Sequence, residues 1–174
     1  LIDCDLRKPK MHHYFGVSNA PGLTNYISDS VKNNGPKTDL YSIIHRTEFS
    51  NLSLLCAGSI PPNPAELLGS EPMAEFLQQI SRDYDYVIID APPLGVVIDA
   101  VIIGKYCDGA VLVIEQGVIK RKVVQDVIKQ LKRGEVRILG AVLNKVDERI
   151  GAYGAYDYKY SYSYYGDSDA EDRH

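Results

Sequence analysis

The sequence predicts an α/β fold built on a doubly wound, mostly parallel sheet that is flanked by helices. The first observation is a set of short, nearly continuous apolar runs, because strands buried on both faces have this pattern. The second observation is that amphipathic helical stretches separate the later runs. The apolar runs that we predict to be strands are residues 1–2, 52–55, 86–89, 110–114 and 137–143.

Helix signals lie between these runs. Over residues 123–131, apolar side chains recur at helical spacing, while lysine and arginine occupy the other faces. Residues 63–66, Asn-Pro-Ala-Glu, supply an N-cap residue, a first-turn proline and a capping glutamate, which together favour a helix start. A second start follows at Ser70, and residues 97–105 are a further helix candidate.

The composition is typical of an ordinary globular domain. The chain has 174 residues, a net charge of −4, 45% hydrophobic and 24% charged residues, which suits one domain. The mild acidity argues against nucleic acid as the main ligand, since phosphate binding needs a concentrated basic face. The three cysteines are odd in number and form no C-x-x-C pair. They argue against a disulfide framework or zinc site and favour a reducing cytoplasm.

The two ends of the sequence differ from its middle. The chain begins with Leu1 and not methionine, and residues 1–3 resemble the end of a buried strand, so we expect an N-terminally truncated domain. Residues 1–150 are predicted to form that domain, and residues 151–174 a flexible tail that lacks Val, Ile, Leu, Met and Phe. The tail carries seven tyrosines: Tyr153, Tyr156, Tyr158, Tyr160, Tyr162, Tyr164 and Tyr165.

Two of the predicted strands are followed by aspartates. Asp3 and Asp5 stand two residues apart at the exit of the first strand, so both point to one side while the strand persists. Asp90 closes the run 86–89 and precedes Ala-Pro-Pro. Because ligands bind beyond the carboxyl ends of the strands in open α/β sheets, we predict that these carboxylates converge as oxygen ligands for Mg²⁺. The alternative is that they are helix caps or turn formers.

Three motifs point to one family. Residues 1–9 are LIDCDLRKP, residues 87–93 are VIIDAPP, and residues 57–68 are AGSIPPNPAELL. The first resembles the Walker A′ motif of the bacterial protein-tyrosine kinases, the second resembles their Walker B motif, and the third is similar to the segment between the two. The tyrosine-rich tail is similar to the one that these enzymes phosphorylate on themselves. The resemblance implies a P-loop NTPase-like fold and autophosphorylation with ATP and Mg²⁺.

The resemblance also implies roles for the three aspartates. Asp3 would accept the proton of the tyrosine hydroxyl, while Asp5 and Asp90 would position Mg²⁺, and these roles are open to exchange. The chain has no H-R-D catalytic loop and no D-F-G sequence. Phosphoryl transfer would therefore follow P-loop chemistry, in which positioning and electrostatics dominate.

Further residues would face the nucleotide. By resemblance, Arg7 and its neighbour Lys8 would stabilise charge near the phosphates, and Asn144 would lie near the adenine. The alternatives are a solvated basic pair and a plain turn. No G-x-x-x-x-G-K-[ST] sequence occurs in the chain, although this Walker A loop cradles the phosphates in the family. We therefore expect that the fragment alone cannot phosphorylate a substrate.

The tail indicates how such a kinase is regulated. Its seven tyrosines are the predicted autophosphorylation sites, and each phosphate adds about −1.5 to −2 charge at pH 7. A fully extended tail reaches at most ~80 Å, which is enough to enter a neighbouring active site. We expect phosphorylation in trans within a ring-like homo-oligomer, which the accumulating charge then loosens.

The resemblance implies partners and a location as well. The family controls capsular or extracellular polysaccharide synthesis and export. Its partners would be a membrane-anchored polysaccharide co-polymerase that acts as an adaptor, and a tyrosine phosphatase. The protein would then work at the cytoplasmic face of the cell membrane, held there by the adaptor or by an N-terminal segment.

Two other functions stay open from the sequence. A partition-type or septum-positioning ATPase shares the Walker A′ and Walker B motifs, but such a protein has no reason to carry a tyrosine cluster. A non-catalytic scaffold whose tyrosines are phosphorylated by another kinase would account for the absent Walker A loop.

Overall fold

The computed structural model describes residues 1–33, 35 and 37–146. The tail tyrosines and the predicted domain boundary after residue 150 lie outside the described residues. No helix in the described part is long and apolar enough to cross a membrane. In chain order the elements are β1 (Ile2–Asp3), α1 (Met11–Phe15), α2 (Leu23–Asn33), the 3-10 helix η1 (Leu40–Ile43), β2 (Ile44–Arg46), β3 (Ser53–Leu55), α3 (Pro64–Leu68), α4 (Glu71–Asp83), β4 (Ile89–Asp90), α5 (Asp99–Gly104), β5 (Ala110–Glu115), α6 (Arg121–Arg133) and β6 (Ile138–Asn144).

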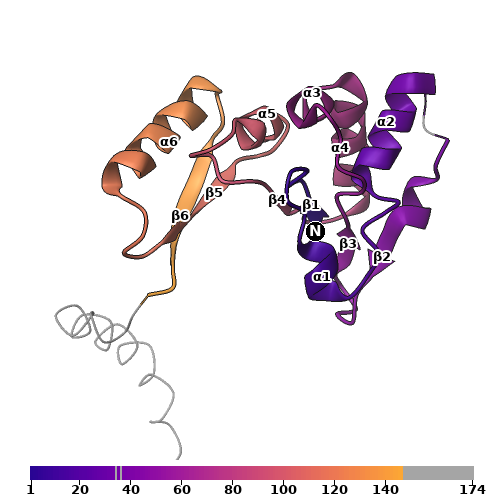
Figure 1. The fold of residues 1–174 in the computed structure, drawn as a ribbon, viewed down its shortest axis with the longest axis horizontal. Coiled ribbons are helices and arrows are strands. Elements are labelled where there is room, and N and C mark those ends of the chain that lie inside the picture. The colour runs from indigo at the N-terminus through magenta and orange to yellow at the C-terminus, as the bar shows by residue number, and fades with distance from the viewer. Residues whose placement is uncertain (34, 36, 147–174) are drawn as a thin grey trace, which may run out of the picture.

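The described strands form two sheets (Figure 1). Four strands lie in the order β2-β3-β1-β4, and β5 pairs with β6 in a separate sheet. β1 runs parallel to β3 and β4, β5 runs parallel to β6, and β2 is an antiparallel edge strand. The predicted α/β fold with mostly parallel strands and flanking helices is confirmed. The strands form two sheets, whereas the sequence predicted one. Among the described strands, none pairs with the outer edge of β4 or the free edge of β5, so the two sheets are not joined.

The hydrophobic core lies in the four-stranded part. Ile2 of β1 and Leu55 of β3 belong to one cluster of buried side chains with Tyr26 of α2 and Phe76 of α4. The ring centroids of Tyr26 and Phe76 are 5.9 Å apart, so the two helices contact each other within this core. Burial of these apolar side chains is the main source of stability for the sheet that carries Asp3.

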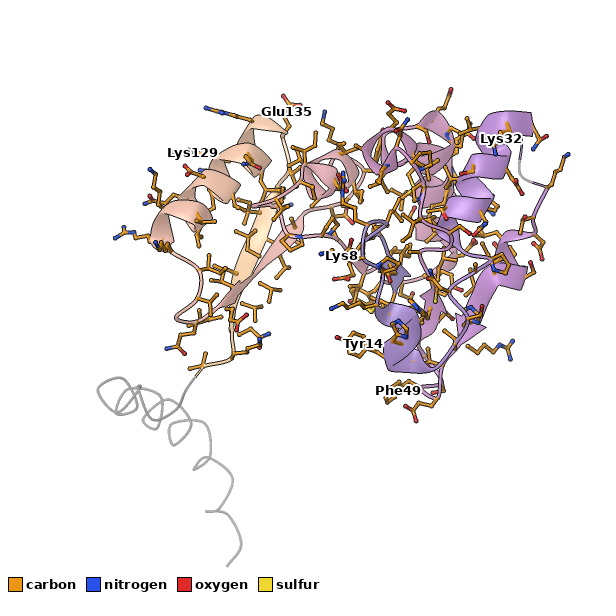
Figure 2. The ribbon with its side chains drawn as sticks, viewed as in Figure 1. Lys8, Tyr14, Lys32, Phe49, Lys129 and Glu135 are labelled. Carbon is orange, nitrogen blue, oxygen red and sulfur yellow. The ribbon has the colours of Figure 1, made fainter. Side chains whose placement is uncertain are left out.

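The two-stranded sheet is less well covered. Leu131 is the one buried residue of α6, and Val111 and Val113 of β5 remain 54% and 67% exposed. Lys129 of α6 and Lys32 of α2 lie toward opposite ends of the molecule, with Lys8 between them (Figure 2). The loop after β1 therefore lies in the middle of the molecule, between the two sheets.

The topology brings the ends of β1 and β4 together. The register pairs Ile2 with Ile89 and Asp3 with Asp90. The backbone N–H of Cys4 donates to the carbonyl oxygen of Asp90 at 2.8 Å, which continues the pairing beyond β1. The chain thus leaves two adjacent parallel strands at the same edge, where the sequence predicted a site.

Candidate active site

The three predicted aspartates do come together at the carboxyl ends of β1 and β4. Asp3 lies directly across from Asp90 in the parallel register, and Asp5 follows two residues after Asp3. Partial burial raises the pKa of Asp90, and the negative charges of Asp3 and Asp5 raise it further. The three carboxylates therefore interact electrostatically, and a cation placed among them would relieve their repulsion.

Asp3 is the buried member of this group. Its side chain is 0% exposed, and both of its oxygens accept backbone hydrogen bonds. Oδ1 accepts from the N–H of Asp5 at 3.1 Å, and Oδ2 accepts from Lys10 at 3.2 Å and Met11 at 3.1 Å. Burial raises the pKa of Asp3, while these hydrogen bonds act in the opposite direction. Asp3 thus holds the loop that joins β1 to α1.

Asp5 lies within that loop and is only half-buried. Its Oδ1 accepts hydrogen bonds from the backbone N–H groups of Arg7 at 3.2 Å and Lys8 at 3.0 Å. This is the local turn that aspartate side chains commonly form with the backbone after them. No hydrogen bond to Asp5 Oδ2 occurs within the described residues, so this oxygen is the one available to a ligand.

The carboxylates fit a magnesium ion that is shared with a nucleotide. No group of three or more His, Cys, Asp or Glu residues in the described ranges is arranged to hold a metal ion by itself. Mg²⁺ does not require such a cage, because it is commonly bound by one or two carboxylates, water and substrate phosphates. Asp5 has a free oxygen and Asp90 is exposed, and their mutual repulsion favours a divalent cation.

Arg7 is engaged by a residue that sequence reasoning did not single out. Its Nε donates to Oδ2 of Asp99 at 2.9 Å, and its Nη2 donates to Oδ1 at 3.0 Å. Asp99 begins α5 and its side chain is 0% exposed, whereas that of Arg7 is 41% exposed. Hydrogen bonding to Asp99 raises the pKa of Arg7. The pair spans 92 residues of sequence, so no local pattern announces it.

Lys8 adjoins the carboxylates through its backbone, whereas Asn144 lies in the other sheet. Lys8 is exposed on the loop after β1 and forms no ion pair with any described residue. Asn144 ends β6, in the separate two-stranded sheet, and its Oδ1 accepts from the N–H of Lys145 at 2.9 Å. Lys145 in turn pairs with Glu115 of β5 at 2.9 Å. A place for Asn144 near the adenine stays a prediction.

The loop that follows β3 is held by side chains just before and within α2. The carbonyl of Gly58 accepts from Asn19 Nδ2 at 2.6 Å, and that of Ser59 accepts from Thr24 Oγ1 at 2.6 Å. Gly58 has φ of +86°, and a Cβ there would lie 2.6 Å from Asn25 Oδ1. Only glycine accepts that conformation without strain. These contacts fix the segment that follows β3 against the start of α2.

Comparison with known proteins places this geometry in a family. No protein-family model matches the chain. The chain is 40% identical to the tyrosine-protein kinase CpsD of Streptococcus agalactiae over 157 aligned residues. The aligned region covers 90% of this chain and 66% of CpsD. The chain thus spans about two thirds of that curated relative.

Solved structures show the same similarity. The kinase domain of VpsO superposes with a TM-score of 0.75 at 35% identity, over 84% of this chain and 69% of that domain. The chimerical protein CapA2B2 superposes with a TM-score of 0.73 at 31% identity, over 83% of this chain and 61% of the chimera. The motifs, the fold and these similarities lead to one conclusion: the chain belongs to the family of bacterial tyrosine-protein kinases.

Proposed function

We propose that this protein is an autophosphorylating protein-tyrosine kinase that transfers the γ-phosphate of ATP to tyrosines of its own tail and thereby regulates capsular or extracellular polysaccharide synthesis and export. The observation that carries the proposal is the register that sets Asp3 opposite Asp90 on adjacent parallel strands, with Asp5 just beyond. In a member of this family, such a group of carboxylates is suited to a nucleotide-bound cation and a proton acceptor.

The geometry supports a division of work among the aspartates. Asp5 and Asp90 would hold Mg²⁺, which when bound neutralises charge on the phosphates of ATP. Asp3 is the candidate proton acceptor from the sequence, but both of its oxygens are bound by backbone N–H groups. The free Oδ2 of Asp5 therefore supports an exchange of roles, in which Asp3 shapes the loop, Asp5 meets the reacting hydroxyl, and Asp90 holds Mg²⁺ together with water and the phosphates.

The phosphates need a further element. The 174 residues contain no Walker A sequence, and in P-loop enzymes that loop supplies the backbone N–H groups and the lysine that hold the β- and γ-phosphates. Arg7 is bound to Asp99 and Lys8 is exposed, so neither replaces a whole loop. We therefore propose that residues 1–174 by themselves do not transfer phosphate.

Partners follow from the same proposal. The tail tyrosines of one subunit would be phosphorylated by a neighbour in a ring-like homo-oligomer, and a tyrosine phosphatase would reverse the modification. Similarity to the chimerical protein CapA2B2 supports association with a CapA-type adaptor. A membrane-anchored adaptor would hold the kinase at the cytoplasmic face of the membrane.

The test measures phosphate transfer by the full-length protein that the gene encodes, with its cognate adaptor added. We expect transfer that requires ATP and Mg²⁺, that is abolished by a chelator, and that is reduced at least 100-fold by Asp5→Asn and by Asp90→Asn. Asp85→Asn, at an exposed aspartate that precedes β4, is the matched control and should retain the wild-type rate. Equal rates for all three variants would refute the assignment of the carboxylates.

A further inference from the structure

The Arg7–Asp99 pair connects the two chain segments that carry the proposed active-site carboxylates. Arg7 lies in the loop after β1, and Asp99 begins α5, at the end of the segment 91–98 that leaves Asp90. The two parallel hydrogen bonds, at 2.9 and 3.0 Å, fix both the distance and the orientation of the two groups. Because Asp99 is wholly buried, its carboxylate depends on this partner.

The backbone of Arg7 is also tied to Asp5. The carboxylate of Asp5 accepts the N–H of Arg7 at 3.2 Å. If Arg7 shifts, the turn that orients Asp5 therefore shifts with it. Asp90, in contrast, is held independently by the pairing of β4 with β1. The pair with Asp99 consequently sets where Asp5 lies relative to Asp90.

Arg7 is poorly placed to act as a phosphate ligand. Two of the three guanidinium nitrogens, Nε and Nη2, already donate to Asp99. Turning the guanidinium toward a phosphate would leave a buried carboxylate without its cation, which is strongly unfavourable. Lys8, which is exposed and forms no ion pair among the described residues, is a cation that is free to move.

We propose that Arg7 and Asp99 are positioning residues for the kinase reaction, and that their bidentate pair sets the separation of Asp5 and Asp90 and takes no part in holding the phosphates. The inference rests on the proposed function and adds to it a residue, Asp99, that lies outside the sequence motifs. It also replaces the ligand role that the sequence predicted for Arg7.

The key variant is Arg7→Lys, which keeps the charge but loses the planar fork. A displacement of about 1 Å at a catalytic group lowers rates by as much as 100-fold, so we expect kcat to fall roughly 10- to 100-fold. The KM for ATP should stay within about twofold, because no phosphate contact is lost, and half-saturation should need more Mg²⁺. Arg133→Lys, at the end of α6, is the matched control and should leave all three quantities unchanged.

A double variant that rescues activity separates a positioning role from a general loss of structure. Lysine is shorter than arginine and glutamate is longer than aspartate, so Arg7→Lys combined with Asp99→Glu restores the reach of the pair. The double variant should recover at least part of the lost kcat, with a coupling between the two changes that independent sites do not show. If Arg7→Lys alone does not fold, this double variant carries the test, and a folded double variant with a wild-type KM for ATP and a kcat below that of the wild type supports the inference.

The assay uses the full-length protein that the gene encodes, together with the adaptor, and follows phosphate transfer to the tail as ATP and Mg²⁺ are varied. A wild-type protein without transfer would remove the proposed function, and the inference with it. If the wild type is active and Arg7→Lys raises the KM for ATP at unchanged kcat, the inference is overturned while the proposed function stands. Arg7 would then be a phosphate ligand. Unchanged kcat and KM, or a folded double variant without any recovery, would overturn it as well.

Discussion

Replacing Asp3 with asparagine tests whether its hydrogen bonds organise the loop after β1. The side chain is wholly buried and accepts three backbone N–H groups. Asparagine keeps a single acceptor oxygen. In the orientation that retains the bonds from Lys10 and Met11, its amide NH₂ faces the N–H of Asp5, so one donor loses its partner.

The expected loss can be worked from these contacts. A hydrogen bond to a charged group contributes about 1.5–3 kcal/mol, and removal of a buried charge whose pKa is raised by burial offsets part of the loss. We therefore expect Asp3→Asn to lower the free energy of unfolding by about 2 kcal/mol. In a domain of this size, that change lowers Tm by roughly 4–8 °C.

Thermal unfolding followed by circular dichroism measures the effect, with urea unfolding as a second measure. Asp85→Asn, at an exposed site, should change the stability by less than about 0.5 kcal/mol. An Asp3→Asn protein that is as stable as the wild type, or more stable, would show that the three hydrogen bonds do not hold the loop. The result bears on catalysis too, because loss of activity in this variant cannot be assigned to proton transfer when the loop itself is displaced.

Three further outcomes are expected. Asp90→Asn should stabilise the fold at pH 7 by up to about 1 kcal/mol, because exposed charge interactions are of that size. Since burial and the charges of Asp3 and Asp5 raise the pKa of Asp90 above its usual 3.8, protonation favours the folded wild type. Urea unfolding should therefore show the advantage of Asp90→Asn shrinking as the pH falls through that raised pKa, and a constant advantage would contradict the cause given. Phe76→Ala should cost about 3–5 kcal/mol, because the ring is 1% exposed, and a loss below 1 kcal/mol would place Phe76 outside the core. Gly58→Ala should cost more than about 1 kcal/mol, because φ is +86° and the new Cβ meets Asn25 Oδ1; a Tm equal to the wild type would show that the loop adapts.

The convergence of the aspartates was predictable because it depends on local patterns. Apolar runs that end in aspartate indicate parallel strands, and parallel strands bring their carboxyl ends to one edge of a sheet. The register sets Asp3 opposite Asp90, as that reasoning expects for the ends of two adjacent parallel strands. The partner of Arg7 was not predictable in this way. Asp99 was assigned only to the helix candidate 97–105, and a pair 92 residues apart leaves no trace in local spacing.

The missed elements have a common cause. Helix α2 follows Pro21 and Gly22 and contains threonine, asparagine and serine, which are weak helix formers. Its contact with α4 stabilises it, as the packing of the Tyr26 ring against the Phe76 ring shows. Strand β2 includes His45 and Arg46, and it exists because β3 offers it an antiparallel partner. In both cases tertiary contacts outweigh local preference.

The division into two sheets was not predictable either. Strand character is encoded in each apolar run, but pairing depends on which neighbour occupies each edge. β4 is only two residues long, Ile89–Asp90, where the run 86–89 was expected, and Tyr86 and Ile88 are 87% and 62% exposed. With β1 on one side and no described strand on the other, the ordered pairing is limited to the residues that face β1.

The most direct measurement of the central claim is a phosphate map of residues 151–174. The full-length protein that the gene encodes is incubated with its adaptor, ATP and Mg²⁺, and the tail peptide is analysed by mass spectrometry. The account predicts phosphate on several of the seven tyrosines in the wild type and on none after Asp5→Asn. An unmodified tail in a protein that steadily hydrolyses ATP would contradict the account and indicate a partition-type ATPase.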